Sequence, residues 1–182
     1  MEILSQIVGY IGTATAVVGF QVKARKHLLL CQIFSNLLVA LSFVLLGPDK
    51  LSGGAICFVA VFHTFFNYLH SKKGNAPPLW QTGIFFVIYT AVSAITLFTA
   101  GSFLFPISLF PYFCSVLFIL AITLKNDSLS RLCFFANASL WIFYDIFGTT
   151  FAVANLVTHI LVLISNIIGI VRMDLIPKFS KK

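Results

Sequence analysis

The sequence predicts an all-α membrane protein with seven transmembrane helices, arranged as two parallel three-helix repeats joined by a linker helix. Three observations lead to this prediction. Of the 182 residues, 59% are hydrophobic and only 9% are charged, whereas a soluble domain carries about 25% charged residues. The apolar residues form seven long runs, and nearly all basic residues lie after every second run. Lipid is therefore the expected solvent for most of the chain.

Each apolar run is long enough to cross a bilayer as a helix. Crossing a hydrocarbon core of ~30 Å takes roughly 20 residues in helical conformation. The predicted spans are residues 3–20, 28–46, 51–69, 79–100, 103–124, 129–147 and 151–171. A membrane β-barrel would instead show strands of about ten residues with alternating polarity. Because these runs are continuously apolar, helices are the predicted elements.

The basic residues predict the orientation of these spans. Of the 12 Lys and Arg residues, all but Lys50 belong to the segments that follow the odd-numbered spans. These residues are Lys23, Arg25, Lys26, Lys72, Lys73, Lys125, Arg131, Arg172, Lys178, Lys181 and Lys182. The positive-inside rule makes their side of the membrane cytoplasmic. We therefore expect the N-terminus outside and the C-terminus in the cytoplasm.

An internal repeat divides the seven spans into two halves of the same orientation. The second and sixth spans align without gaps at an offset of 101 residues, which pairs Asn36 with Asn137 and Gly47 with Gly148. A three-span unit can repeat in the same orientation only if the chain crosses the membrane once more between the copies. The predicted units are residues 1–75 (first repeat), 76–101 (linker helix) and 102–182 (second repeat with a short basic tail). Parallel repeats of this kind occur in transporters.

The sparse polar residues within the spans are the candidate site. Polar groups inside a bilayer are costly and usually face an interior cavity or a neighbouring helix. His63 and Asn67 are four residues apart, as are Asn155 and His159, so each pair shares a helix face. In the repeat, these two faces would point at each other. The residues predicted to line a pocket are Asn36, His63, Asn67, Asn137, Trp141, Asn155, His159 and Asn166. The alternative is that they bond or pack neighbouring helices together.

Two further residues are candidates for gating. Asp145 is an acidic residue within a span, and with His159 it would form a proton-responsive pair at the outer gate. The alternative places its carboxylate in the membrane interface. Pro111 lacks a backbone N–H and is expected to kink the fifth span, either as a static bend or as a hinge.

Other function classes lack their sequence signatures. The chain has no Gly-rich phosphate loop, no metal-spaced His/Cys cluster and no nucleophile motif, so we expect no enzyme activity, cofactor or metal. The net charge of +7 does not indicate nucleic-acid binding, because the basic residues lie in short connections and not on one folded face. The expected partners are the lipid bilayer and a small-molecule solute.

The chain resembles the YgjV-like bacterial inner-membrane proteins. In the second half, the runs LWIFYD (140–145) and NIIGIVR (166–172) carry the resemblance. In the first half, Phe20, Gln21 and the basic loop after them fit as well. That family is similar to the SWEET and PQ-loop superfamily, whose members have a three-plus-one-plus-three helix arrangement. The resemblance implies a transporter-like fold with a pocket between the two units, and it implies no particular substrate.

Two departures from those relatives argue against sugar transport by proline-hinged gating. The first span ends in Phe20-Gln21 where the relatives have a Pro-Gln pair. The sugar transporters have prolines in four pocket helices, whereas here the fifth span alone has them, at Pro106 and Pro111.

The sequence favours a small-solute transporter or facilitator in which the two units rock around a midplane site. A receptor or sorting protein and a structural protein with an inert core are the alternatives. A transporter needs a polar cavity, and a receptor for peptide carboxylates needs Arg or Lys in its pocket. An inert protein would have Asn36, Asn67, Asn137 and Asn166 all satisfied by neighbouring helices.

Overall fold

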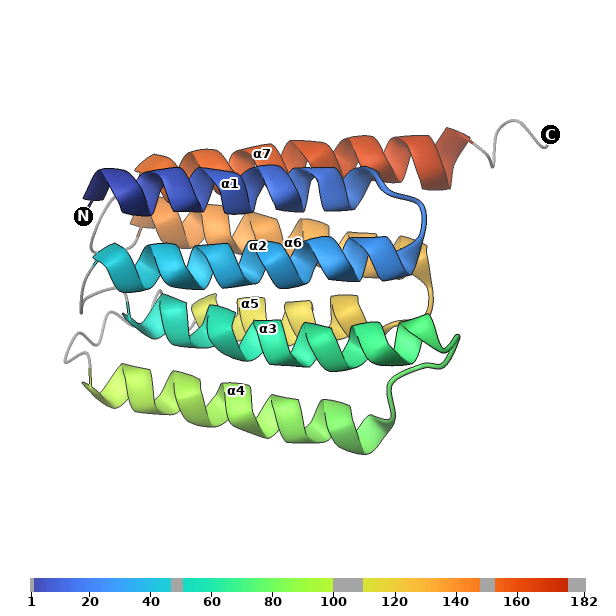
Figure 1. The fold of residues 1–182 in the computed structure, drawn as a ribbon, viewed down its shortest axis with the longest axis horizontal. Helices are drawn as coiled ribbons and strands as arrows, with labels where there is room; N and C mark the ends of the chain where they lie inside the picture. Colours follow the sequence, from blue (N-terminus) through green and yellow to red (C-terminus); the bar gives the residue numbers. More distant parts are fainter. Residues whose placement is uncertain (1, 47–50, 100–109, 148–152, 177–182) are drawn as a thin grey trace.

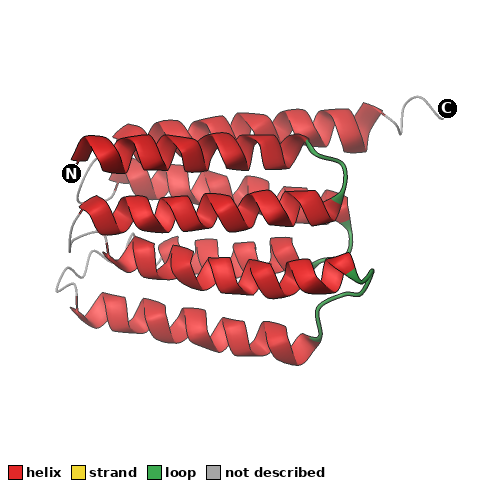
Figure 2. Ribbon diagram, viewed as in Figure 1, coloured by secondary structure: helices red, strands yellow, loops and turns green. Residues whose placement is uncertain are grey.

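The described part of the chain is helical throughout. The computed structural model describes residues 2–46, 51–99, 110–147 and 153–176. Its helices are α1 (Glu2–Gln21), α2 (Arg25–Leu46), α3 (Leu51–Lys72), α4 (Leu79–Thr99), α5 (Phe110–Thr123), α6 (Asp127–Phe147) and α7 (Val153–Ile170). A short π-helical segment, η3 (Val171–Leu175), continues α7. Within these residues only helices and loops are present (Figure 2).

These helices coincide with the predicted spans. Four stretches are long and apolar enough to cross a membrane by length and composition: Ile3–Gln21, Arg25–Leu45, Leu79–Thr96 and Leu156–Leu175. Helix α5 is a shorter apolar helix, and the predicted start of its span, residues 103–109, lies outside the described residues. The prediction of an all-helical protein with membrane-spanning helices is confirmed, whereas the full set of seven spans and the two-repeat arrangement stay predictions.

The helices pack in two layers with one helix at the edge. Helices α1, α2 and α3 lie side by side in chain order, and α7, α6 and α5 form the layer behind them (Figure 1). The layers meet where α1 packs on α7 and where α3 packs on α5. Helix α4 packs on α3 and α5 and lies outside the other six. The odd-numbered helices run in one direction and the even-numbered helices in the other.

Small residues let α1 and α2 approach closely. A Cβ atom at Gly19 would lie 2.8 Å from the Cβ of Cys31, so a side chain there would push the helices apart. Near the other end of the pair, Ser5 Oγ donates to the carbonyl oxygen of Ser42 (2.9 Å), and Ser42 Oγ donates to the carbonyl oxygen of Ser5 (2.8 Å). Such interhelical hydrogen bonds and small residues are what hold helices together in lipid, where hydrophobic burial gives no driving force.

Polar contacts also join α1 to α7, which links the two layers. Thr13 Oγ1 donates to Thr158 Oγ1 over 3.0 Å, and Gln21 Nε2 donates to the carbonyl oxygen of Ser165 over 2.8 Å. One turn beyond Ser165 the backbones come close, because a Cβ at Gly169 would lie 2.8 Å from the carbonyl oxygen of Phe20 in α1. The outward faces of the bundle are apolar, with Leu79 and Phe98 more than four-fifths exposed. Such faces suit contact with lipid tails.

Three described connections carry basic residues, and they lie at one end of the bundle, which we call the basic end. They are residues 22–24, 73–78 and 124–126 (Figure 1). Gly74, with φ of +72°, terminates α3 there. Its N–H bonds to the carbonyl of Ser71 and the N–H of Asn75 bonds to the carbonyl of His70. This is the Schellman pattern, which favours glycine because the left-handed conformation is strained for other residues.

Two arginines that the sequence analysis counted among connecting-segment charges belong to helices. Arg25 is the first residue of α2, and Arg131 lies in the second turn of α6, where it is only 4% exposed. The Nη1 of Arg131 donates to Oδ1 of Asp174 over 2.9 Å, and Ser128 Oγ donates to the same oxygen over 2.8 Å. A hydrogen-bonded carboxylate offsets much of the cost of burying a guanidinium. That partner, 43 residues away, explains why Arg131 lies deeper than its sequence neighbours suggest.

Candidate functional site

A cavity of about 120 Å³ lies near the middle of the bundle. Helices α1, α2, α3, α5, α6 and α7 form its walls, and α4 contributes Tyr89. The polar lining is Thr13, Gln32, Ser35, Asn36, Cys57, Tyr89, Cys114, Ser115, Asn137, Thr158 and His159, and the aromatic lining also includes Phe20, Phe43, Phe118, Phe134 and Trp141. The described lining contains no Lys, Arg, Asp or Glu. This volume has room for several water molecules or one small solute.

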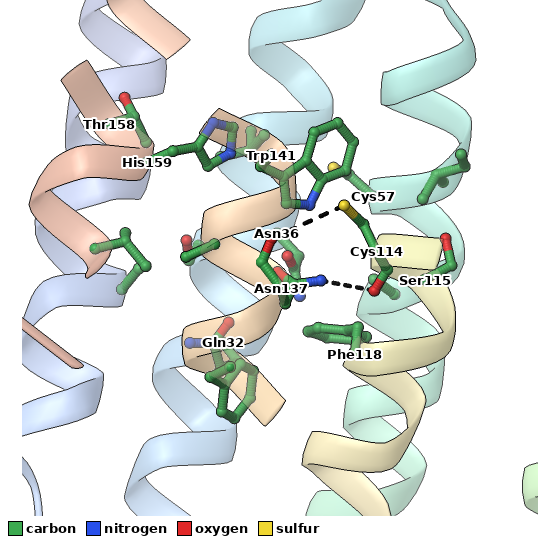
Figure 3. Close-up of a pocket in the computed structure, with 18 of the residues that line it drawn as sticks. Gln32, Asn36, Cys57, Cys114, Ser115, Phe118, Asn137, Trp141, Thr158 and His159 are labelled. Atoms are coloured by element: carbon green, nitrogen blue, oxygen red, sulfur yellow. Dashed lines mark hydrogen bonds between the residues drawn. The ribbon is translucent and has the colours of Figure 1, made fainter. Parts of the chain in front are cut away.

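Two asparagines at matching positions of α2 and α6 line this cavity (Figure 3). Asn137 Nδ2 donates to the carbonyl oxygen of Cys114 over 2.6 Å, which ties α6 to α5. By contrast, Asn36 Nδ2 is buried and has no hydrogen-bond partner among the described residues. Asn36 therefore keeps a donor for a molecule in the cavity, while Asn137 serves both the cavity and the packing.

An aromatic pair from α6 and α7 forms one wall of the cavity. The rings of Trp141 and His159 stack with centroids 5.4 Å apart and planes 10° apart. Tyr144 packs edge-on against Trp141, with centroids 5.6 Å apart. Stacked aromatic rings give a rigid apolar surface, while the ring nitrogens supply polar edges. Such a wall can hold the apolar face of a solute and orient its polar groups.

Most of the cavity lining was not predicted from the sequence, and Gln32 and Tyr89 illustrate two different reasons. Gln32 precedes Asn36 by four residues, so the i,i+4 rule places it on the same helix face and would have identified it. Tyr89 comes from α4, the helix expected to lie outside the core. It is 1% exposed, and its hydroxyl has no hydrogen-bond partner among the described residues. Its position depends on how α4 packs on α3 and α5, which the sequence does not show.

His63 and Asn67 are not among the lining residues of this cavity. His63 is fully buried and stacks on Phe85 of α4, with ring centroids 4.3 Å apart. Asn67 Nδ2 donates to the carbonyl oxygen of Ile122 in α5 (3.1 Å), and Gln81 Nε2 of α4 donates to Asn67 Oδ1 (2.9 Å). The expected meeting of this face with α7 is therefore not found, because α4 and α5 pack on it instead.

Asn166 also lies away from the cavity lining. It is fully buried, and its Nδ2 donates to the backbone carbonyl oxygen of Arg131 over 2.8 Å. The bond ties α7 to α6. Asn67 and Asn166 thus bond neighbouring helices together, which was the alternative to pocket lining.

Three predicted residues fall at the limits of the described chain. Asp145 lies in α6 and Asn155 in α7, but their side chains lie outside the described residues. The proposed Asp145–His159 pair therefore stays a prediction. Pro111 is the second residue of α5, and its carbonyl accepts a hydrogen bond from Ser115 Oγ (2.9 Å). The residues before Phe110, where a proline kink would be seen, lie outside the described part.

One comparison with known proteins identifies a family for this chain. The sequence model of the Imp-YgjV family, described as bacterial inner membrane proteins, matches residues 3–175. The chain belongs to this family. No curated protein and no solved structure matches the sequence of this Imp-YgjV protein. The match covers every described helix, so the residues around the cavity all belong to the family region.

Proposed function

We propose that this Imp-YgjV protein is a transporter or facilitator of a small, uncharged polar solute that binds in the central cavity. The observation that carries the proposal is a polar cavity in the middle of an apolar bundle. A buried polar group without a partner costs about 1–3 kcal/mol. Asn36 and Tyr89 both bring such groups to the cavity lining. A solute with hydroxyl or amide groups would satisfy them.

The pattern of helix contacts supports a two-fold repeat around this cavity. In the repeat, α1, α2 and α3 correspond to α5, α6 and α7. Each unit packs in chain order, and the contact of α1 with α7 has its counterpart in the contact of α5 with α3. Helix α4 lies outside both units, as a linker would. We propose a SWEET-like arrangement in which the two units rock about the cavity and expose it to either side in turn.

The lining supports an uncharged and compact solute. The described lining carries no full charge, and an ion would be costly to desolvate without a counter-charge. Pockets for drug-sized ligands are about 300–1,000 Å³, so a cavity of about 120 Å³ suits a smaller molecule. Amide and hydroxyl groups supply donors and acceptors, and the Trp141–His159 wall supplies a flat apolar contact. We further propose that the basic end is cytoplasmic, with the N-terminus outside.

The cavity also weighs against the two alternative functions. A receptor for a peptide carboxylate would need Arg or Lys in the pocket, and the described lining has neither. In a structural protein with an inert core, all four membrane asparagines would be satisfied by neighbouring helices. Asn67 has partners for both its nitrogen and its oxygen, whereas Asn36 Nδ2 has none among the described residues.

A thermal-shift screen tests the proposal. The detergent-purified protein would be scanned against small uncharged metabolites, because a ligand at 100 times its Kd stabilises the folded state by about 2.7 kcal/mol. We expect at least one compound to raise the Tm of the wild type. Asn36→Leu should weaken that compound's binding about tenfold or more, since it removes a donor from the cavity.

Asn166→Leu is the matched control, because it removes the same amide from a buried site outside the cavity lining. It should leave the affinity for the compound unchanged. Equal losses of affinity in Asn36→Leu and Asn166→Leu would contradict binding in the cavity. The absence of any stabilising compound among uncharged metabolites, with charged compounds stabilising instead, would contradict the proposed solute class.

A further inference from the structure

A second cavity, of about 290 Å³, lies at the basic end of the bundle. It is formed by the start of α2, the end of α3, the end of α5 and the connection from α3 to α4. Buried Asn67 and Ile122 line its interior, and exposed Gly74, Asn75 and Lys125 lie at its mouth. None of these residues lines the central cavity, so this is a separate site.

Two buried donors line this second cavity without a hydrogen-bond partner among the described residues. They are Nη1 of Arg25 and Oγ1 of Thr123. The guanidinium is held in place by its other nitrogen, because Nη2 donates to the carbonyl oxygen of Ile122 over 2.7 Å. An arginine is a donor only, with five N–H groups and no acceptor. The Nη1 of Arg25 has an ion-pair partner in Asp127, 3.5 Å away, but no hydrogen-bond partner among the described residues. It can therefore donate to an acceptor in the cavity, and the Thr123 hydroxyl can donate to the same group.

The charge of this region favours an anion. Arg25 and Lys125 both line the cavity, and its lining contains no acidic residue. The carboxylate facing this region is that of Asp127, whose Oδ1 lies 3.5 Å from Arg25 Nη1 and which is not a lining residue. Lys72 and Lys73, exposed beside the wall of the cavity, add positive charge. Asp127 pairs with Arg25 alone, and the three lysines of this region add positive charge, so the local balance is positive.

We propose that the second cavity binds a phosphate group, through Arg25, Lys125 and Thr123. A phosphate has several acceptor oxygens, so it can accept from a guanidinium, an ammonium and a hydroxyl at once, and such charge-assisted bonds are the strong ones. Basic pockets between membrane helices at the cytoplasmic side also suit anionic lipid headgroups. The phosphate comes either from such a headgroup or from a soluble phosphate compound. The inference does not depend on the proposed transport function, because it concerns different residues.

The test measures phosphate binding by the full-length protein in two arms. In detergent, the Tm of the protein is measured at increasing concentrations of inorganic phosphate, and chloride at equal ionic strength is the reference. We expect phosphate to raise the Tm, and Lys125→Gln to raise the apparent Kd about tenfold because it removes a charge-assisted bond. Thr123→Val, which removes only the hydroxyl, should raise it about threefold. In the second arm, native mass spectrometry compares retained phosphatidylglycerol with retained phosphatidylcholine.

Lys73→Gln is the matched control, since it removes one positive charge from the same end of the bundle but not from the cavity lining. If the wild type retains phosphatidylglycerol, Lys125→Gln loses it and Lys73→Gln keeps it, the result supports the proposal and identifies a lipid headgroup as the source of the phosphate. A phosphate-dependent Tm shift with the same variant pattern, and no lipid preference, supports it with a soluble phosphate. Equal effects of Lys125→Gln and Lys73→Gln in both arms would overturn it, and so would a wild type that shows neither a phosphate-dependent Tm shift nor a preference for phosphatidylglycerol.

Discussion

Asparagines at the central cavity and at the basic end of the bundle have opposite surroundings. Asn36 lines the central cavity, and its amide nitrogen has no partner among the described residues. Asn67 lies toward the basic end, where it accepts from Gln81 and donates to the carbonyl of Ile122. Both are amides inside an apolar helix. The comparison shows that the number of partners, and not the residue type, separates a candidate binding group from a structural one.

The network around Asn67 extends across four helices. His70 Nε2 and Gln81 Oε1 are 3.0 Å apart, Gln81 bonds Asn67, and Asn67 shares the carbonyl of Ile122 with Arg25. The bonds therefore connect α4, α3, α5 and α2. At the central cavity, Asn137 bonds α5, while Asn36 Nδ2 has no partner among the described residues.

The largest expected effect on stability comes from Asn67→Leu. The substitution breaks two hydrogen bonds and leaves the buried Gln81 amide and the Ile122 carbonyl each one bond short. We expect the free energy of unfolding to fall by about 2 kcal/mol, because interhelical bonds in membranes average about 0.6 kcal/mol and buried unpaired groups add to the loss. Denaturant titration of the detergent-solubilised protein measures it. A loss no greater than that of Asn36→Leu would remove the distinction between the two asparagines.

A smaller loss is expected for Asn166→Leu. Only its amide nitrogen has a partner, the backbone carbonyl of Arg131, and its Oδ1 has none among the described residues. The substitution breaks one bond and leaves the Arg131 carbonyl one bond short, so it should lower the free energy of unfolding by about 1 kcal/mol. The same titration ranks it against Asn67→Leu, and a reversed order would show that partner number does not set the loss.

Asn36→Leu is expected to have the smallest effect on stability. No hydrogen bond of its amide nitrogen is lost, and leucine has a similar size, so the free energy of unfolding should change by less than about 0.5 kcal/mol or rise. The substitution should nevertheless abolish most solute binding. A loss of 1 kcal/mol or more in the same titration would mean that Asn36 has a structural role like that of Asn67.

Sequence reasoning predicted the helices well, because continuous apolar runs leave few alternatives in lipid. It also named Asn36 and Asn137 from a repeat that stays a prediction, and both residues line the central cavity. It placed His63 and Asn67 toward α7, yet α4 and α5 pack on that face. A helix face can be predicted from spacing, but its neighbour depends on which helices pack together.

Buried charges were the other feature that spacing did not reveal. Arg131 was counted among the connecting segments, while in the structure it is buried beside Asp174. The two residues are separated by 43 positions, so no local pattern links them. A similar argument applies to Tyr89, which reaches the cavity from a helix at the edge of the bundle. Long-range packing decided each of these positions.

Flux through the protein tests the central claim most directly. Purified wild type would be reconstituted in liposomes, and uptake of a radiolabelled solute from the thermal-shift screen would be compared with that of empty liposomes. The account predicts solute flux well above the empty control, lowered about tenfold or more in Asn36→Leu and retained in Asn166→Leu. Tight solute binding with no flux above empty liposomes would contradict transport and would favour a receptor built around the same cavity.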